Sequence, residues 1–180
     1  VRTVNLDEYA GLDETSDQSY VYFMRKNLFD SLDIDRKNTN IENGKAADRE
    51  KECERYNALL HEMQQSVQVL GIGSNGHIAF NEPGTPFGSE THIVDLTEST
   101  IRDNSRLFSR IEDVPRQAFT MGLKNIMNAE KIVILANGKN KAKAVYGLVK
   151  GPVTEQLPAS VLQLHPDCTV VVDEEAASLL

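Results

Sequence analysis

The alternation of apolar and polar positions predicts strands and helices that follow one another along the chain. Short apolar runs, mostly rich in β-branched residues, predict strands over residues 1–6, 67–72, 92–96, 131–136 and 168–172. Helical periodicity and start signals predict helices over residues 17–30, 48–64, 98–108, 115–120, 122–128, 139–150 and 158–164, with a last helical turn or two over 173–180. This order indicates an α/β fold with a mainly parallel sheet covered on both faces. The polar segment 31–47 predicts a surface connection.

Apolar periodicity also predicts which side chains of the first two helices enter the core. In the helix over 17–30 they are Tyr20, Phe23, Met24 and Leu28. In the helix over 48–64 they are Cys53, Tyr56, Leu59, Leu60 and Met63. We therefore interpret the aromatic residues of the first helix as core rather than as a stacking platform, and Cys53 as a packing residue rather than a nucleophile.

The stretch GIGSNGHIAFNEPGTPFGS, residues 71–89, breaks this alternation directly after a strand. Its five glycines and two prolines exclude a regular helix or strand. Loops at the carboxyl ends of strands are where open α/β sheets bind ligands. A turn at Asn81-Glu82-Pro83 would return Glu82 to His77, and Asn75 lies on the same side as His77 if the segment is extended. We predict an imidazole oriented by a carboxylate and an amide, suited to proton transfer near neutral pH; the alternative is a structural turn with a solvent-facing histidine.

Other polar groups follow the first and fourth predicted strands. Asp7 and Glu8 follow the strand over 1–6, where they either face a ligand or cap a turn. Asn137-Gly138 and Lys141 lie between a strand and a helix, and this junction either binds a phosphate or is an ordinary connection.

One helix carries a stripe of arginines. Arg102, Arg106 and Arg110 recur every four residues and share a face. The stripe is either a solvated surface or supplies one arginine to a cleft.

Composition and charge narrow the classes of function. The 180 residues suit a single domain over residues 1–180, and 19 basic against 27 acidic residues give a net charge of −8, which argues against nucleic-acid and membrane-surface partners. The chain has no long apolar run and no signal pattern, and its two cysteines, Cys53 and Cys168, form no redox motif, so we expect a cytoplasmic protein. The histidines lack metal-ligand spacing, and no metal is expected. A strand at the very first residues, with no Met before it, predicts a missing N-terminal portion.

Five motifs along the whole chain resemble the glucosamine-6-phosphate deaminase family. They are VNLDEYAGL at 4–12, GIGSNGHIAFNEPG at 71–84, Asn-Ser-Arg at 104–106, Asn-Gly-Lys-Asn-Lys-Ala at 137–142 and Leu-Gln-Leu-His at 162–165. The resemblance implies a Rossmann-like three-layer α/β/α sandwich. It also implies conversion of glucosamine 6-phosphate and water to fructose 6-phosphate and ammonia without a cofactor.

The resemblance assigns roles to residues of this chain. His77 would move the proton that opens the pyranose ring, oriented by Glu82 and Asn75. Asp7 would transfer the C-2 proton to C-1. Two further sets are implied: Arg106 and Lys141 bind the substrate phosphate, and Gly71 and Gly73 belong to the substrate-binding loop.

Three departures from the family pattern bear on this expectation. Position 75 is Asn where many members have Asp, so we expect it to orient His77 without holding a proton. His92 and Val94 replace the basic residues of allosteric members, so activation by N-acetylglucosamine 6-phosphate is not expected. The family's upstream phosphate-cradling loop has no counterpart here.

Two other functions stay open at this point. They are a hydrolase similar to 6-phosphogluconolactonase and a non-catalytic module that binds a sugar phosphate. Homo-oligomerisation also stays open.

Overall fold

The computed structural model covers residues 1–180 and describes all side chains except those of Ser99, Asp103 and Leu107. Its contacts divide the chain into two compact units. Unit 1 comprises residues 1–56 and 91–120, and unit 2 comprises residues 57–90 and 121–180. The division falls within helix α2 (Arg49–Glu62) and again at the two ends of the segment 91–120.

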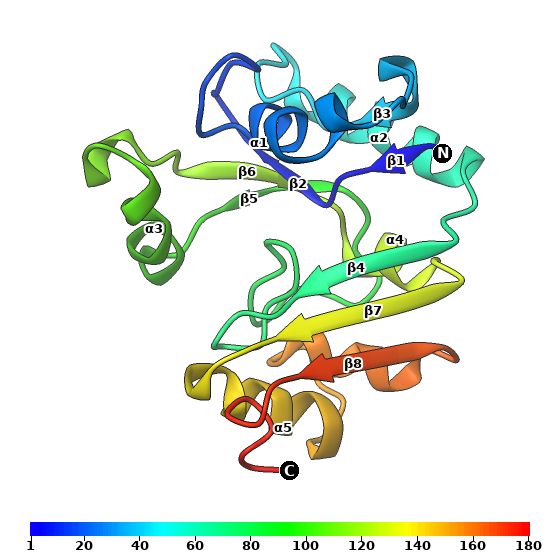
Figure 1. Ribbon diagram of the computed structural model, residues 1–180, viewed down its shortest axis with the longest axis vertical. Coiled ribbons are helices and arrows are strands. Elements are labelled where there is room, and N and C mark those ends of the chain that lie inside the picture. Colours follow the sequence, from blue (N-terminus) through cyan, green and yellow to red (C-terminus); the bar gives the residue numbers. More distant parts are fainter. The chain divides into compact units, whose positions relative to one another are not determined.

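Unit 1 contains a small antiparallel sheet with strand order β2-β6-β5 (Figure 1). Its strands are β2 (Asp7–Tyr9), β5 (His92–Asp95) and β6 (Gln117–Thr120). A separate parallel pair joins β1 (Thr3–Val4) to β3 (Thr39–Asn40). The remaining elements are α1 (Tyr20–Asn27), α3 (Glu98–Asn104) and the 3-10 turns η1 (Phe29–Ser31), η2 (Arg36–Asn38), η3 (Ser105–Leu107) and η4 (Ile111–Asp113).

Unit 2 is built on a parallel sheet with strand order β4-β7-β8, and the three arrows run in one direction in Figure 1. The strands are β4 (Val67–Gly71), β7 (Lys131–Ala136) and β8 (Cys168–Val172). Gly71 pairs with Leu135, and Ala136 pairs with Val172, so the loops that follow the three strands all leave from the carboxyl end of the sheet. The helices are α4 (Leu123–Met127), α5 (Ala142–Lys150), η5 (Lys139–Lys141) and η6 (Pro158–Leu164).

The two faces of the parallel sheet differ in burial. Leu70, Ile132 and Ile134 point to one face and are fully buried. Val67 and Val69 alternate with Leu70 and are each about half exposed, and Leu135 and Val171 on the same face are similarly exposed. This face of the parallel sheet is therefore only partly covered by the residues that the structure describes. A purely parallel sheet is normally buried on both sides, which makes this face unusual.

Two secondary-structure predictions are wrong. Residues 117–120 form a strand rather than a helix, because β6 pairs with β2 on one side and β5 on the other. Pro115 lies just before this central strand, where its missing N–H removes no ladder hydrogen bond. At the N-terminus, the strand over 1–6 shortens to β1, and Asp7 begins β2 rather than following a buried strand.

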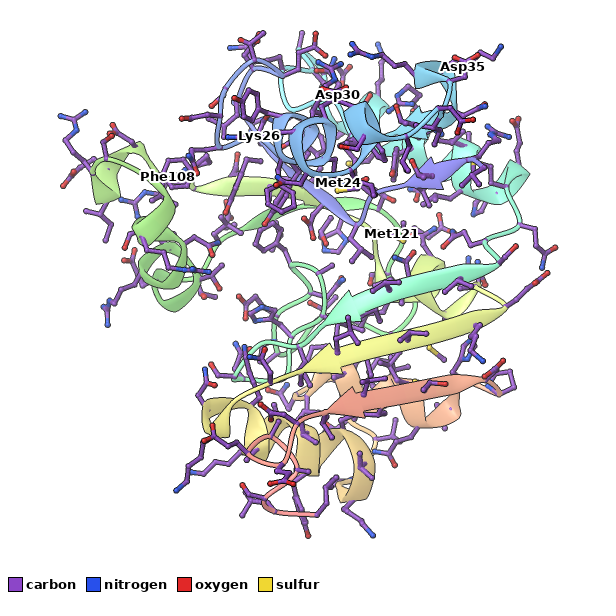
Figure 2. The ribbon with its side chains drawn as sticks, in the orientation of Figure 1. Met24, Lys26, Asp30, Asp35, Phe108 and Met121 are labelled. Carbon is purple, nitrogen blue, oxygen red and sulfur yellow. The ribbon has the colours of Figure 1, made fainter. Side chains whose placement is uncertain are left out.

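Helix α1 is shorter and more exposed than its pattern predicts. The Ser19 hydroxyl caps it by accepting the Tyr22 N–H at 3.1 Å, and the helix ends at Asn27. Met24 is half-buried on the side toward β2, but Phe23 and Leu28 are largely exposed (Figure 2). A two-turn helix packs only a narrow stripe, so the predicted four-residue core is wrong at these two positions.

The polar segment 31–47 is not simply a surface connection. Thr39 and Asn40 pair with β1, and Glu42 is 1% exposed. Tyr56 of α2 is fully buried and donates its hydroxyl proton to the carbonyls of Asn5 and Asn40 at 2.8 and 3.2 Å. These contacts fold the segment into unit 1.

Candidate active site

The loop after β4 holds His77 between an amide and a carboxylate. The Asn75 Oδ1 lies 2.7 Å from His77 Nδ1, and the Asn75 amide group donates to Glu82 Oε2 at 2.7 Å. His77 Nδ1 is 3.6 Å from the same carboxylate oxygen. The predicted grouping of imidazole, amide and carboxylate is thus confirmed.

This chain of contacts fixes the neutral tautomer of His77. Because the Asn75 amide nitrogen donates to Glu82, its Oδ1 is left to accept, so His77 Nδ1 carries the proton. Oδ1 also accepts the His77 backbone N–H at 3.1 Å. Nε2 is therefore the nitrogen able to accept a proton from a substrate.

Gly73 gives the imidazole the room it occupies. A Cβ at this position would lie 2.3 Å from His77 Nδ1 and Cε1, so the ring would have to move to make room for it. The Gly73 N–H also donates to the His77 carbonyl at 2.9 Å. A Cβ on Gly71 would meet no atom within 4 Å, so no comparable packing reason requires glycine there.

A second segment, residues 154–160, holds the His77 loop in place. The Gly84 N–H donates to the Glu155 carbonyl at 2.7 Å, and the Ala159 N–H donates to the Gly76 carbonyl at 2.9 Å. The Leu157 side chain lies where a Cβ on Gly76 would project, at 2.6 Å, and Gly76 has a φ of +85°. We call residues 154–160 the strap, and it contacts the loop on both sides of His77.

Asn81 anchors the inside of the same loop. It is fully buried, and its amide group donates to the carbonyls of Ile78 and Met121 at 3.0 and 2.9 Å. Ala79 between His77 and Asn81 has a φ of +52°, an uncommon left-handed conformation for a residue with a Cβ. The turn that returns Glu82 to His77 is thus held by a buried side chain.

The turn after β7 places Lys141 at the same carboxyl end of the sheet as the His77 loop. Lys141 ends η5 and precedes α5, and it is half-buried. The Gly138 N–H at this junction donates to both Asp173 carboxylate oxygens at 2.9 and 3.1 Å, so this amide is not available to a phosphate.

Asp7 opens β2 in unit 1 and is a weakened acid. Loss of hydration and, as the smaller cause, the negative charge of Glu8 together raise its pKa from 3.8 to about 7. A carboxyl group with this pKa exchanges protons readily at neutral pH.

Glu42 is a second weakened acid in this unit. Neither of its carboxyl oxygens has a hydrogen-bond partner among the described residues. Burial is the main reason that its pKa lies well above the ordinary value of 4.5. Burial therefore favours the protonated form of Glu42.

Arg106 lies in η3, exposed, between two residues that contact Tyr9. The Asn104 amide group donates to the Tyr9 hydroxyl at 2.9 Å, and the Phe108 ring (Figure 2) meets the Tyr9 ring edge-on at 5.9 Å. Tyr9 follows Asp7 by two residues, so the segment carrying Arg106 is attached to the strand carrying Asp7. Of the other arginines in the predicted stripe, Arg110 is bonded to Asp113 at 2.8 Å.

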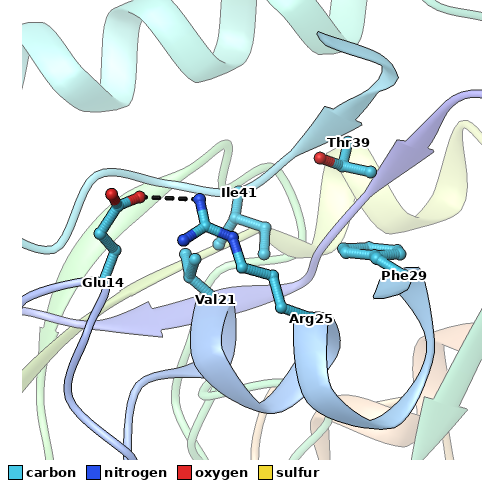
Figure 3. A pocket seen from close by; sticks show the side chains of 6 residues that line it. All are labelled: Glu14, Val21, Arg25, Phe29, Thr39 and Ile41. Atoms are coloured by element: carbon cyan, nitrogen blue, oxygen red, sulfur yellow. Dashed lines mark hydrogen bonds and ion pairs between the residues drawn. The ribbon is translucent and has the colours of Figure 1, made fainter. Parts of the chain in front are cut away.

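A small pocket in unit 1 contains none of the predicted site residues (Figure 3). Its volume is about 170 Å³, and its polar centre is the ion pair of Arg25 with Glu14 at 2.9 Å. Ligand pockets usually measure about 300–1,000 Å³, so this hollow is small for a sugar phosphate.

Among the described side chains, no group of three or more His, Cys, Asp or Glu residues could hold a metal ion. Within that described part, no helix combines the length and apolar character needed to span a bilayer.

Comparison with known proteins places the chain in a family. The sequence pattern of the glucosamine-6-phosphate isomerases/6-phosphogluconolactonase family matches residues 5–171. The chain belongs to this family. A glucosamine-6-phosphate deaminase from Lactobacillus johnsonii is 57% identical over 178 residues, which are 99% of this chain and 74% of that protein.

Solved structures of the family agree with this placement. A monomeric glucosamine-6-phosphate deaminase superposes with a TM-score of 0.97 at 48% identity, covering 99% of this chain and 75% of that one. The 6-phosphogluconolactonase of Trypanosoma brucei gives 0.80 at 20% identity, covering 99% and 74%, which shows a shared fold alone. The predicted Rossmann-like α/β class and the resemblance to the deaminases are confirmed.

Proposed function

We propose that this member of the family is a glucosamine-6-phosphate deaminase, which converts glucosamine 6-phosphate and water to fructose 6-phosphate and ammonia. The observation that carries the proposal is the 57% identity, over 99% of the chain, to a deaminase. The likeness to a lactonase at 20% identity concerns the fold alone, so it does not favour the alternative.

His77 opens the sugar ring in this proposal. Its Nε2 accepts the proton of the C-1 hydroxyl, and the resulting imidazolium gives a proton to the ring oxygen. Asn75 and Glu82 support this step, because the amide fixes the tautomer and the carboxylate at 3.6 Å stabilises the positive charge. The amide at position 75 supplies orientation without titrating.

Asp7 moves the proton that converts the aldose to the ketose. Its carboxylate removes the C-2 proton of the open chain and returns it at C-1, which leaves an imine at C-2. Water then adds to this imine, and the C–N bond breaks to give the ketone and ammonia. A pKa of about 7 supports both halves of this step, since a group that takes a proton and gives it back works best near the ambient pH.

Arg106 and Lys141 bind the substrate phosphate in this proposal. A guanidinium can donate two parallel hydrogen bonds to phosphate oxygens, and an ammonium adds a mobile positive charge. Such local cations are needed because the chain as a whole carries a net charge of −8. Gly73 belongs to the proposed substrate loop through its contact with His77, whereas Gly71 has only its position at the end of β4 to support it.

Ammonia release from glucosamine 6-phosphate tests the proposal directly. Ammonia and fructose 6-phosphate should appear in equal amounts, and N-acetylglucosamine 6-phosphate, whose nitrogen is blocked, should yield none. Hydrolysis of 6-phosphogluconolactone without ammonia release would favour the lactonase alternative. Binding of glucosamine 6-phosphate without any product would favour a non-catalytic module.

A further inference from the structure

Glu8 is a buried carboxylate bound by backbone amides. It is 1% exposed. Its Oε1 accepts the N–H groups of Tyr9 and Tyr20 at 2.8 and 3.0 Å, and its Oε2 accepts that of Val21 at 2.9 Å. Because all three partners are donors, the ionised carboxylate, which accepts at both oxygens, suits this site.

These bonds join two elements of unit 1. Tyr20 and Val21 are the first residues of α1, whose N–H groups have no carbonyl partner within the helix. The carboxylate of Glu8 satisfies them from β2, and its charge is favourable at the positive end of a helix. Glu8 therefore holds β2 against the first turn of α1.

Glu8 also affects the ionisation of its neighbour Asp7. After loss of hydration, the charge of Glu8 is the second cause of the raised Asp7 pKa. The residues paired with β2 from β6 do not titrate, and they are Thr120, Phe119 and Ala118.

Other titratable groups surround these two carboxylates, and burial raises the pKa of each. They are Tyr9 on β2, Tyr20 on α1, Glu42 after β3 and Tyr56 on α2. Burial raises the pKa of Glu8 as well, but its three backbone N–H donors favour the ionised form.

We propose that Glu8 is a positioning residue for the deamination: it fixes the β2 backbone that presents Asp7 and places a negative charge beside that carboxyl group. This inference rests on the proposed function, since it takes Asp7 as the base. It gives Glu8 no contact with the substrate.

The test compares Glu8→Gln with a matched control, Glu52→Gln. Glu52 is also a buried carboxylate of unit 1 that accepts a backbone N–H, from Asn43 at 2.7 Å, but it is not among the groups that raise the Asp7 pKa. In Glu8→Gln we expect kcat to fall about 10- to 100-fold, because the base is displaced. We also expect the acid limb of the kcat/KM profile to move to lower pH. Glu52→Gln should keep the wild-type profile, and an unmoved acid limb in Glu8→Gln would overturn the proposal.

A conservative variant separates charge from position. Glu8→Asp keeps the charge but shortens the side chain, so kcat should fall while the acid limb stays closer to its wild-type pH than in Glu8→Gln. An acid limb displaced equally in both variants would show that charge is not the cause.

Carboxyl ¹³C NMR gives a readout that needs no turnover. The Asp7 resonance, assigned by its loss in Asp7→Asn, should titrate at lower pH in Glu8→Gln than in the wild type. If the wild type releases no ammonia, the proposed function fails, and this titration still decides whether Glu8 tunes Asp7. If Glu8→Gln does not fold, the wild-type Asp7 resonance must respond to the ionisation of Glu8; two independent titrations would contradict the inference.

Discussion

Asp7 and His77 are prepared for proton transfer by opposite means. Asp7 loses hydration, and its pKa rises to about 7. His77 gains partners, since Asn75, Glu82 and Gly73 fix its tautomer, its charge environment and its position. Removing the charge at Asp7 should thus stabilise the folded state at neutral pH, whereas disturbing the neighbours of His77 should displace its imidazole. The comparison teaches that raising the pKa of a carboxyl group by burial lowers the stability of the folded state, whereas orienting a histidine by hydrogen bonds does not.

Asp7→Asn should have the largest effect, and it tests the Asp7 side of the comparison by removing the carboxyl group. We expect kcat to fall about 10²- to 10⁴-fold, because the amide cannot accept the C-2 proton. The folded state binds more protons than the unfolded state between pH values near 3.8 and about 7, so wild-type stability falls as pH rises through this range. Asp7→Asn should therefore be more stable than wild type at pH 8, by about 1–4 kcal/mol, but not at pH 3.

Urea unfolding at both pH values measures this difference. Asp33→Asn, the same change at an exposed carboxylate of unit 1, is the matched control and should alter neither turnover nor stability appreciably. Undiminished ammonia release in Asp7→Asn would remove Asp7 from the mechanism.

Gly73→Ala should have the next largest effect, on the histidine side. The new Cβ would displace the imidazole, and a displacement of about 1 Å can cost about 100-fold in rate. The matched control is Gly88→Ala in the same loop, where a Cβ meets no atom within 4 Å. Steady-state kinetics should show loss of kcat in the first variant only; equal kinetics in the two would mean that the ring position does not limit the reaction.

Asn75→Asp sharpens the comparison by adding charge beside His77. The new carboxylate would lie within hydrogen-bond distance of both the ring and Glu82, so it would stabilise the imidazolium and repel the Glu82 charge. We expect a several-fold change in kcat/KM at neutral pH. Asn57→Asp, outside this group, controls for the added charge, and a profile unchanged by Asn75→Asp would argue against the assigned tautomer.

Leu157→Ala should have the smallest effect and probes the strap. Its side chain fills the space beside Gly76 and Gly147, and a half-buried leucine should contribute about 1–2 kcal/mol. Hydrogen exchange should accelerate at the Gly84 and Ala159 amides, which bond the loop to the strap. Leu164→Ala, at a largely exposed leucine, should leave these amides protected.

The parallel sheet and the His77 group were predictable from the sequence because their signals are local. The strands over 67–71, 131–136 and 168–172 are short apolar runs, and the glycines and prolines of 71–89 exclude regular structure. Asn75, His77 and Glu82 lie within eight consecutive residues, so one turn brings them together.

The remaining features depend on partners distant in sequence. The carboxylate of Glu8 is bonded to amides 12 and 13 residues later, and nothing in the pair Asp7-Glu8 predicts them. Residues 117–120 become a strand because two other strands flank them, which outweighs the helix-start signal of Pro115. Glu42 lies in a polar segment that predicts an exposed side chain, so its burial could not be predicted from the residues around it.

The carboxylate of Asp173 links the segment after β8 to the turn that presents Lys141. It accepts the Gly138 N–H, and it also accepts the Ala176 N–H at 2.7 Å. Proteolytic cleavage after Val172 would therefore free the Gly138 amide without touching any residue assigned to the sugar.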